Sequence, residues 1–353
     1  MITLLCLNKK ELESFVNSGE YSTFDFLPIT KHRALSQIKN EKADDEDVLL
    51  TLAFEGEKLA GYLGTFPDRL KQEIKFAWLS TLYVSENFRG KRIAQQLLEK
   101  VFEKYDGKIG ITEFTKEAES LYNKTKQFHY ITPKTGNRYY FKSDLGEIIP
   151  RKKKSLMPFK PIFQIADFVA NSVISFNNQF TKTHQINFEI KDFVDEASSI
   201  FLEQFEKHRT SKEITWIMKN PWVLEGNNVE KDYLFSSYAK EFKYFWVKIF
   251  DEYGNIEACS LLNLRDGHLK ISYFFGKRKN FVFFLQNFIR DHKVKVLTSY
   301  QTELNESFNK KKFPKIHQKD LERRYLFHKK LLEILPEDFE PIFQDGDGDP
   351  VFT

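Results

Sequence analysis

The same order of secondary-structure elements is predicted twice along this chain, and that repetition restricts the fold more than any other feature. Alternating apolar residues indicate strands, and apolar residues three or four positions apart indicate amphipathic helices. The first half is expected to contain strands 48–54, 58–66 and 76–84, helix 93–105, strand 108–114, helix 116–127 with Thr115 as its N-cap, and strand 138–142. The apolar residues 2–7 predict a strand that precedes them. The second half is expected to contain strands 243–251, 256–264 and 268–275, helix 279–291, strand 293–300, helix 302–311 and strand 322–329. We therefore expect a duplicated α/β fold, in which each half is a mostly antiparallel mixed sheet flanked by helices.

The length of 353 residues favours two domains, because a single hydrophobic core rarely grows to this size. We expect a first domain at 1–145, a linker with a connecting helix at 146–180, a second domain at 181–335 and a tail at 336–353. The linker holds three prolines and the basic run Arg151–Lys154, which predict an exposed segment. Attachment of this basic segment to a membrane surface is the alternative reading.

Composition and charge argue against several classes of function. The net charge of +4 is too small to indicate a nucleic-acid partner. Cys6 and Cys259 stand far apart, so we expect neither disulfides nor a metal site, and a reducing cytoplasm fits best. No stretch of about 20 apolar residues predicts insertion into a membrane. The acidic run Asp345–Asp349 resembles the start of a calcium loop, but Pro350 replaces its glycine, so a plain acidic turn is expected.

The most informative segment runs from a strand through a basic, glycine-containing turn into an amphipathic helix. The strand ends at Leu82, Tyr83 and Val84, and the turn and helix start are formed by Arg89, Gly90, Lys91, Arg92, Ile93 and Ala94. Successive amides at a helix N-terminus bind anions, and the three cations suit a ligand with several phosphates. As a first-turn residue, Arg92 is expected to have ordinary helical dihedral angles. The segment therefore predicts a site for a polyphosphate group.

This arrangement resembles the GNAT acetyltransferase superfamily across roughly residues 2–142. The turn matches the family pattern R/Q-x-x-G-x-G/A at Arg89 and Ala94, with Arg92 in place of the middle glycine. A second family motif, N-x-x-A-x-x-L-Y-x-x-x-G-F, is matched at Ala118, Leu121, Tyr122 and Phe128, with Thr115 and Gln127 as departures and one residue more than the motif between Tyr122 and Gln127. The resemblance implies that the turn amides bind the pyrophosphate of acetyl-coenzyme A.

The resemblance also implies a reaction, the transfer of an acetyl group from acetyl-coenzyme A to a primary amine of a small molecule or peptide. A backbone N–H within Leu82–Val84 would stabilise the oxyanion, and Tyr122 would donate a proton to the departing thiolate. The general base stays open among Asp68, Glu73 and Glu113, with water relays as a further possibility. The identity of the amine and the oligomeric state are not readable from the sequence.

The second half departs from the family pattern at the positions that carry the chemistry. Its third strand leads directly into Gly276-Lys277-Arg278, and Phe308 stands where Tyr122 stands in the first half. A phenyl ring cannot donate a proton, so we expect a degenerate GNAT-like copy. Two alternatives stay open: a transferase of the peptidoglycan type that uses aminoacyl-tRNA, and a non-catalytic module that binds coenzyme A or a protein.

Overall fold

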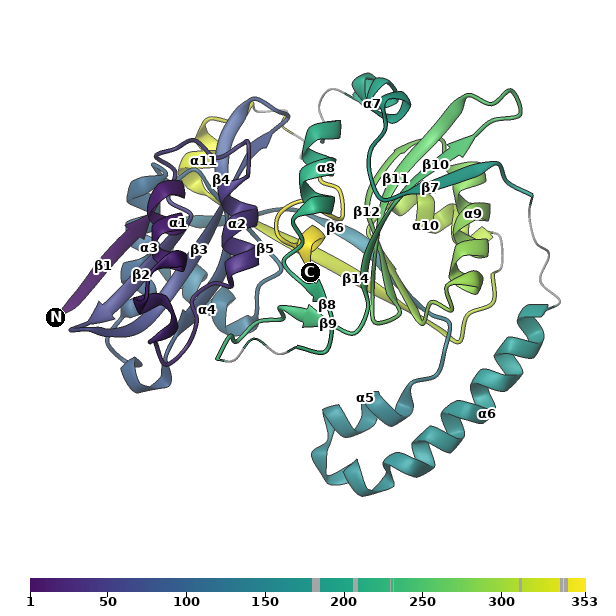
Figure 1. Cartoon of the computed structure of the whole chain (residues 1–353), viewed down its shortest axis with the longest axis horizontal. Helices are drawn as coiled ribbons and strands as arrows, with labels where there is room; N and C mark the ends of the chain where they lie inside the picture. Colours follow the sequence, from purple (N-terminus) through teal and green to yellow (C-terminus); the bar gives the residue numbers. More distant parts are fainter. Residues whose placement is uncertain are drawn as a thin grey trace. The chain divides into compact units, whose positions relative to one another are not determined.

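The chain forms two compact units, each assembled from segments distant in the sequence, in the computed structural model shown in Figure 1. The structure describes residues 1–179, 185–205, 209–228, 230, 232–310, 313–336, 339 and 342–353. Unit 1 comprises Met1–Lys134, Phe193–Phe242 and Arg323–Thr353, and unit 2 comprises Thr135–Asp192 and Lys243–Glu322.

These units differ from the domain boundaries expected from the sequence. Residues 193–242 and 323–353, expected in the second domain and the tail, belong to unit 1. The expected boundary at residue 181 and the expected helix end at Lys311 lie outside the described residues. The difference arises because these later segments find their packing partners on the first sheet, as described below.

Unit 1 is built on a mixed sheet in which strands run in the order β1-β2-β3-β4-β5-β14. The strands are β1 (Ile2–Leu7), β2 (Leu50–Glu55), β3 (Lys58–Leu70), β4 (Ile74–Val84), β5 (Ile109–Thr112) and β14 (His317–His328). All neighbours are antiparallel except β4 and β5, which run parallel. The expected mostly antiparallel mixed sheet is therefore confirmed.

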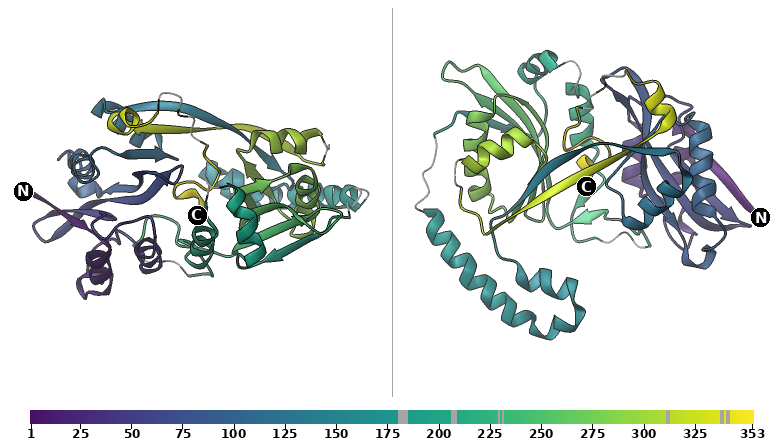
Figure 2. Two further views of the ribbon diagram at one scale, coloured as in Figure 1. Left: turned by 90° about the horizontal axis from the view of Figure 1, so that it is seen from above. Right: turned by 180° about the vertical axis from the view of Figure 1, so that it is seen from behind.

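Helices cover both faces of this sheet, as Figure 2 shows. Leu50 and Leu52 pack with residues of α1 (Lys9–Asn17) and α2 (Lys31–Ile38). Ala53 lies on the other face of the sheet, which packs against α3 (Ile93–Lys104) and α4 (Lys116–Thr125). Alternation of side chains along β2 thus separates two hydrophobic cores. Later segments add α7 (Glu196–Leu202), α8 (Ser211–Lys219), β8 (Leu224–Glu225), β9 (Tyr238–Ala239) and α11 (Lys329–Glu333).

Unit 2 repeats the same order of elements around its own sheet, whose strands run β6-β13-β12-β11-β10-β7. Its elements are β6 (Phe128–Tyr140), α5 (Leu145–Lys152), α6 (Lys160–Gln179), β7 (Phe188–Lys191), β10 (Phe242–Phe250), β11 (Ile256–Arg265), β12 (His268–Gly276), α9 (Arg278–Asp291), β13 (Val296–Ser299) and α10 (Thr302–Lys310). Phenylalanines of α9 and α10 fill the core against β11 and β12. The expected duplication is present. The expected connecting helix is α6, whereas the linker expected before it forms a further helix, α5.

The last strand of each predicted half pairs within the other unit. Residues of β6 from Thr135 onward belong to unit 2, where Tyr140 pairs with Val296 of β13. Residues of β14 from Arg323 onward belong to unit 1, where Tyr325 pairs with Thr112 of β5. The expectation that each half forms its own sheet from its own residues is therefore wrong. A strand's periodicity shows that it is a strand but does not identify the neighbour with which it pairs.

A buried charge cluster joins the three segments of unit 1. It consists of Lys42, Asp68, Arg209, Glu213 and Asp347, whose side chains are 3 to 13% exposed. The guanidinium of Arg209 donates to Asp68 at 2.6 Å and to Asp347 at 2.9 Å, and Lys42 lies 2.9 Å from Asp68. Burial opposes ionisation of Asp68, but the charges of Arg209 and Lys42 outweigh it and hold the pKa of that carboxyl well below its usual range. Its ionisation stabilises the fold at neutral pH, and this contribution is lost as the pH falls below about 4.

Replacing the central cation should destabilise unit 1 strongly. Arg209→Met leaves buried carboxylates without their main partner and should lower the free energy of unfolding by about 3–5 kcal/mol. Lys100→Met, which removes a surface ion pair with Glu103, is the control and should leave the free energy of unfolding nearly unchanged. Urea unfolding followed by fluorescence reports on this unit, which contains Trp78, Trp216 and Trp222. Equal costs for the two variants would contradict the prediction.

Candidate functional site

Strands β4 and β5 separate within unit 1, and the site begins at this separation. The parallel pairing of β4 with β5 ends at Leu79 and Ile111, although β4 continues to Val84. At the same point a bulge interrupts the pairing with β3, because two residues of β4, Ser80 and Thr81, stand opposite Gly64 alone. A bulge bends the strand and increases its twist, so it turns the end of β4 away from β5.

The segment Leu82–Val84 thereby presents one backbone edge that does not pair with β5. The amide of Ser85 donates to the carbonyl of Ala60 in β3. Because amides alternate along a strand, those of Leu82 and Val84 point to the opposite side. All three residues of Leu82–Val84 are partly exposed. The structure thus brings the segment expected to stabilise an oxyanion to the mouth of the separation.

The turn between β4 and α3 offers unpaired amides at the start of a helix. A short 3-10 helix at Glu86–Phe88 leads to Arg89 in extended conformation, and α3 begins at Ile93. Among the described residues, no protein atom accepts a hydrogen bond from the amides of Gly90–Ala94, and α3 has no side-chain cap at its N-terminus. These five uncapped amides and the helix dipole are suited to binding an anion.

The three basic side chains of this turn differ in their surroundings. Lys91 lies 2.6 Å from Glu55, and Arg89 lies 3.0 Å from Glu86, both on the surface. Arg92 is exposed and takes the left-handed conformation, with φ of 58° and ψ of 26°. The expectation of ordinary helical angles for Arg92 is therefore wrong: it is the N-cap residue, at a position whose conformation favours glycine.

This geometry predicts opposite effects for two neighbouring substitutions. Arg92→Gly removes the strain of a left-handed arginine and should raise the free energy of unfolding by about 0.5–1 kcal/mol. Gly90 has φ of +85°, and nothing lies within 4 Å of a Cβ built there, so Gly90→Ala tests conformational strain alone. It should lower the free energy of unfolding by about 1 kcal/mol. Urea unfolding of both variants provides the measurement, and a destabilised Arg92→Gly would show that the side chain compensates for its strain.

Tyr122 lies on α4, under the same part of the sheet. The helix starts at the N-cap Thr115, whose hydroxyl accepts from the amide of Ala118, as the sequence predicts. The ring of Tyr122 is buried against Phe114 and Phe128. Burial, and secondarily the charge of Asp349, raise the pKa of the phenol well above its usual range. The phenol is therefore protonated at neutral pH, as a proton donor must be.

Two of the three acids expected as general bases have other partners in the structure. Asp68 belongs to the buried charge cluster and is held ionised by Arg209 and Lys42. Glu113 forms an ion pair of 2.9 Å with Arg323. Glu73 is exposed in the turn between β3 and β4, directly before the start of β4. Among the described residues, none of the three forms a hydrogen bond, ion pair or ring contact with Ser80 or Tyr122.

Asp349 is the acid that the structure brings to the site. Its carboxylate accepts a hydrogen bond of 2.9 Å from the hydroxyl of Ser80, at the bulge of β4. Arg33 of α2 donates to the same hydroxyl at 2.7 Å and stacks on the ring of Trp222 at 4.0 Å. Next to Asp349, Gly348 packs on Thr112 of β5. The final segment of unit 1 therefore lies over the point where β4 and β5 separate.

The surroundings of Asp349 raise the pKa of its carboxyl group, so it holds its proton more strongly than it would in water. Burial, helped by the charge of Glu113, raises the pKa of this half-buried carboxyl, and Arg33 and the Ser80 hydroxyl oppose the rise. Sequence reasoning missed this residue and read it only as part of an acidic turn. The available signal was its position before the apolar Pro350–Phe352, all three of which are buried. Phe352 stacks on Trp222 at 4.5 Å, which fixes the segment.

The corresponding part of unit 2 has the scaffold without these groups. A bulge in β12 at Ser272 interrupts its pairing with β11, and pairing with β13 ends at Lys270. However, β12 leads into α9 through Lys277 alone, and Phe308 of α10 is buried in the core. In the second copy, β12 and α9 are thus joined by a single residue, and Phe308 stands at the position of Tyr122.

No group of three or more described His, Cys, Asp or Glu side chains is arranged to hold a metal ion. No described helix is both long and apolar enough to cross a membrane.

Comparisons with known proteins identify the fold. The model of the acetyltransferase (GNAT) family matches residues 16–129. A GCN5-related N-acetyltransferase from Kribbella flavida is similar at 9% identity, with 92% of this chain and 71% of that chain covered and a TM-score of 0.50. A probable N-acyltransferase from Enterococcus faecalis V583 is similar at 12% identity, with 94% and 73% covered and a TM-score of 0.52. No curated protein sequence matches the chain. At these identities the two structures show a shared fold.

Proposed function

We propose that this chain, whose residues 16–129 match the acetyltransferase (GNAT) family, is an N-acetyltransferase that uses acetyl-coenzyme A. The acceptor is proposed to be a primary amine of a small molecule or peptide. One observation carries the proposal: the amides of Gly90–Ala94 have no acceptor among the described residues and stand at the entrance of α3, beside the open edge of β4.

The proposed binding mode follows from the chemistry of that turn. The pyrophosphate would accept hydrogen bonds from the amides of Gly90–Ala94, with Arg89, Lys91 and Arg92 supplying positive charge around it. The pantetheine arm would run along Leu82–Val84, where the outward amides of Leu82 and Val84 offer it hydrogen bonds. Lys91 would have to exchange its ion pair with Glu55 for a phosphate, at small cost because that pair is exposed.

Two residues would move protons in the transfer. The amine nitrogen attacks the thioester carbon, a C–N bond forms, and the C–S bond breaks. Tyr122 would give its phenolic proton to the departing sulfur, since its raised pKa keeps that proton in place at neutral pH. An outward amide of Leu82–Val84 would stabilise the negative charge on the carbonyl oxygen during the transfer.

Asp349 would accept the proton that the attacking amine loses. Its carboxylate lies beside the bulge of β4 and close enough to Tyr122 for its charge to affect the pKa of that phenol. A carboxyl with a raised pKa is a better proton acceptor than an ordinary one. Arg33 and Ser80 would hold the carboxylate in position. This assignment replaces the three candidates expected from the sequence.

Removing the phenol should separate chemistry from binding. Tyr122→Phe should lower kcat by about 100-fold, because the thiolate leaves without a proton, and should leave the Kd for acetyl-coenzyme A within about twofold. Tyr105→Phe is the control, since this buried phenol at the C-cap of α3 donates to the carbonyl of Val48. Thiol release with a panel of amines, amino sugars and peptides gives kcat, and calorimetric titration gives Kd.

The unaltered protein in this experiment also tests the proposal as a whole. If acetyl-coenzyme A fails to bind, the proposal is wrong and a transferase that uses aminoacyl-tRNA becomes the better reading. If it binds and no amine of the panel turns over, a non-catalytic module is favoured. If Tyr122→Phe retains full kcat, the phenol has no part in the chemistry.

Replacing the proposed base should change the pH dependence of the reaction. Asp349→Asn should lower kcat/KM at least about tenfold and abolish the fall in rate at acidic pH. In the unaltered protein, the pKa that governs this fall should lie above the usual range of carboxyl groups. Glu73→Gln and Glu113→Gln are the matched controls and should keep that acidic limb. A pH–rate profile for each variant provides the measurement. An acidic limb that persists in Asp349→Asn and disappears in a control would transfer the role to that control residue.

A further inference from the structure

The helices α5 and α6 of unit 2 form a hairpin (Figure 1), and α6 carries a row of exposed apolar side chains. Ile162, Ile165, Val169 and Val173 of α6 are 57 to 66% exposed. Their spacing of three and four residues places them on one side of the helix. Exposed apolar groups gathered on one face usually mark an interaction surface.

The opposite side of α6 already has its partner, so the exposed face is a second and separate apolar surface. Asp167 accepts hydrogen bonds of 2.8 Å from the amides of Leu145 and Gly146, at the start of α5. Asn171 exchanges two hydrogen bonds with the backbone of Ser143. A Cβ built at Gly146 would lie 2.8 Å from Gln164, so the two helices approach as closely as glycine permits. These bonds fix which side of α6 faces outward.

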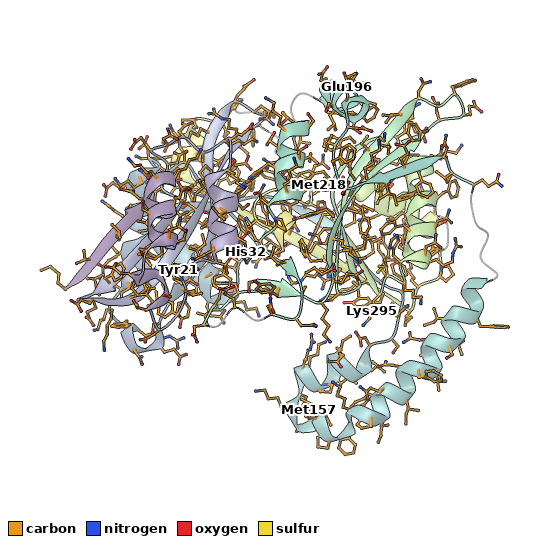
Figure 3. All side chains as sticks on the ribbon, in the orientation of Figure 1. Tyr21, His32, Met157, Glu196, Met218 and Lys295 are labelled. Carbon is orange, nitrogen blue, oxygen red and sulfur yellow. The ribbon has the colours of Figure 1, made fainter. Side chains whose placement is uncertain are left out.

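The turn of the hairpin adds positive charge beside this apolar face. Lys152, Lys153 and Lys154 are exposed, and no ion-pair partner for them is found in the described part of the chain. Met157 and Phe159, 52 and 50% exposed, follow directly, and Figure 3 shows Met157 at the turn.

The acidic groups of the hairpin are all engaged. Glu147 lies 2.7 Å from Lys160, and Asp167 points into the hairpin. The exposed surface of the hairpin therefore combines apolar side chains with uncompensated cations.

We propose that this hairpin binds the surface of an anionic lipid bilayer. The apolar side chains of α6 would enter the boundary between headgroups and acyl chains, while Lys152, Lys153 and Lys154 contact anionic headgroups. Charge complementarity favours a bilayer over a second copy of this chain, because a second copy would bring the same cations to the contact. Neither described helix crosses a membrane, so the association is peripheral. This inference does not depend on the proposed acetyl transfer.

Vesicle sedimentation with the full chain tests the proposal. The probes are vesicles that contain phosphatidylglycerol and vesicles of phosphatidylcholine alone, at low and high salt. One variant, Lys152→Glu/Lys153→Glu/Lys154→Glu, removes the cations, and another, Ile165→Ser/Val169→Ser, removes apolar area. The controls are Lys10→Glu/Lys58→Glu/Lys319→Glu and Ile316→Ser/Ile334→Ser, which alter exposed residues elsewhere. Far-UV circular dichroism confirms that each variant folds.

The proposal expects binding to anionic vesicles that weakens at high salt, falls at least about tenfold in both hairpin variants and persists in both controls. Failure of the unaltered protein to sediment with anionic vesicles would overturn it. Equal loss in the control variants would also overturn it, because net charge alone would then explain the binding. If light scattering instead shows a dimer that only Ile165→Ser/Val169→Ser dissociates, the face is an interface between copies of the chain.

Discussion

Five charged side chains buried together hold unit 1 in one piece. Moving a charge from water into a protein interior costs several kcal/mol, and only close partners offset that cost. In the buried charge cluster, Arg209 brings Asp68 of β3 and Asp347 of the final segment onto one guanidinium, and Lys42 adds a second cation. Each carboxylate therefore depends on a cation from another part of the chain. This dependence explains why a discontinuous set of segments forms a single unit.

The cluster has a direct effect on the candidate site. Asp347 is held by Arg209, and Phe352 is held by Trp222, so the residues between them have little freedom. Asp349 lies in this interval and reaches the hydroxyl of Ser80. The contacts of Asp347 and Phe352, on either side of Asp349 in the sequence, thus hold its carboxylate beside β4. The residues that stabilise unit 1 therefore also fix the geometry of the candidate site.

Local patterns in the sequence predicted the elements well and their partners poorly. Periodicity placed β1 at Ile2–Leu7 and α4 behind its cap Thr115, because both features depend on neighbouring residues. The same reasoning could not find the exchange of β6 and β14, since either sheet satisfies the pattern of each strand. Pro150 argued for a linker where α5 forms, and packing on α6 overrides that local signal. Asp349 was invisible for a related reason: its partners Ser80 and Arg33 lie more than 250 residues earlier in the chain, so no local spacing could reveal them.

The exchange of strands has a consequence for synthesis on the ribosome. Strand β5 emerges early, yet the strand that pairs with its outer edge, β14, is made more than 200 residues later. Domains ordinarily fold as they leave the ribosome, in order from the N-terminus. Here the first sheet waits for nearly the whole polypeptide, and a chain released early exposes an unpaired edge, which is a recognised hazard for aggregation. Nascent copies of this protein should therefore rely on chaperones more than copies of a tandem protein whose halves are each complete.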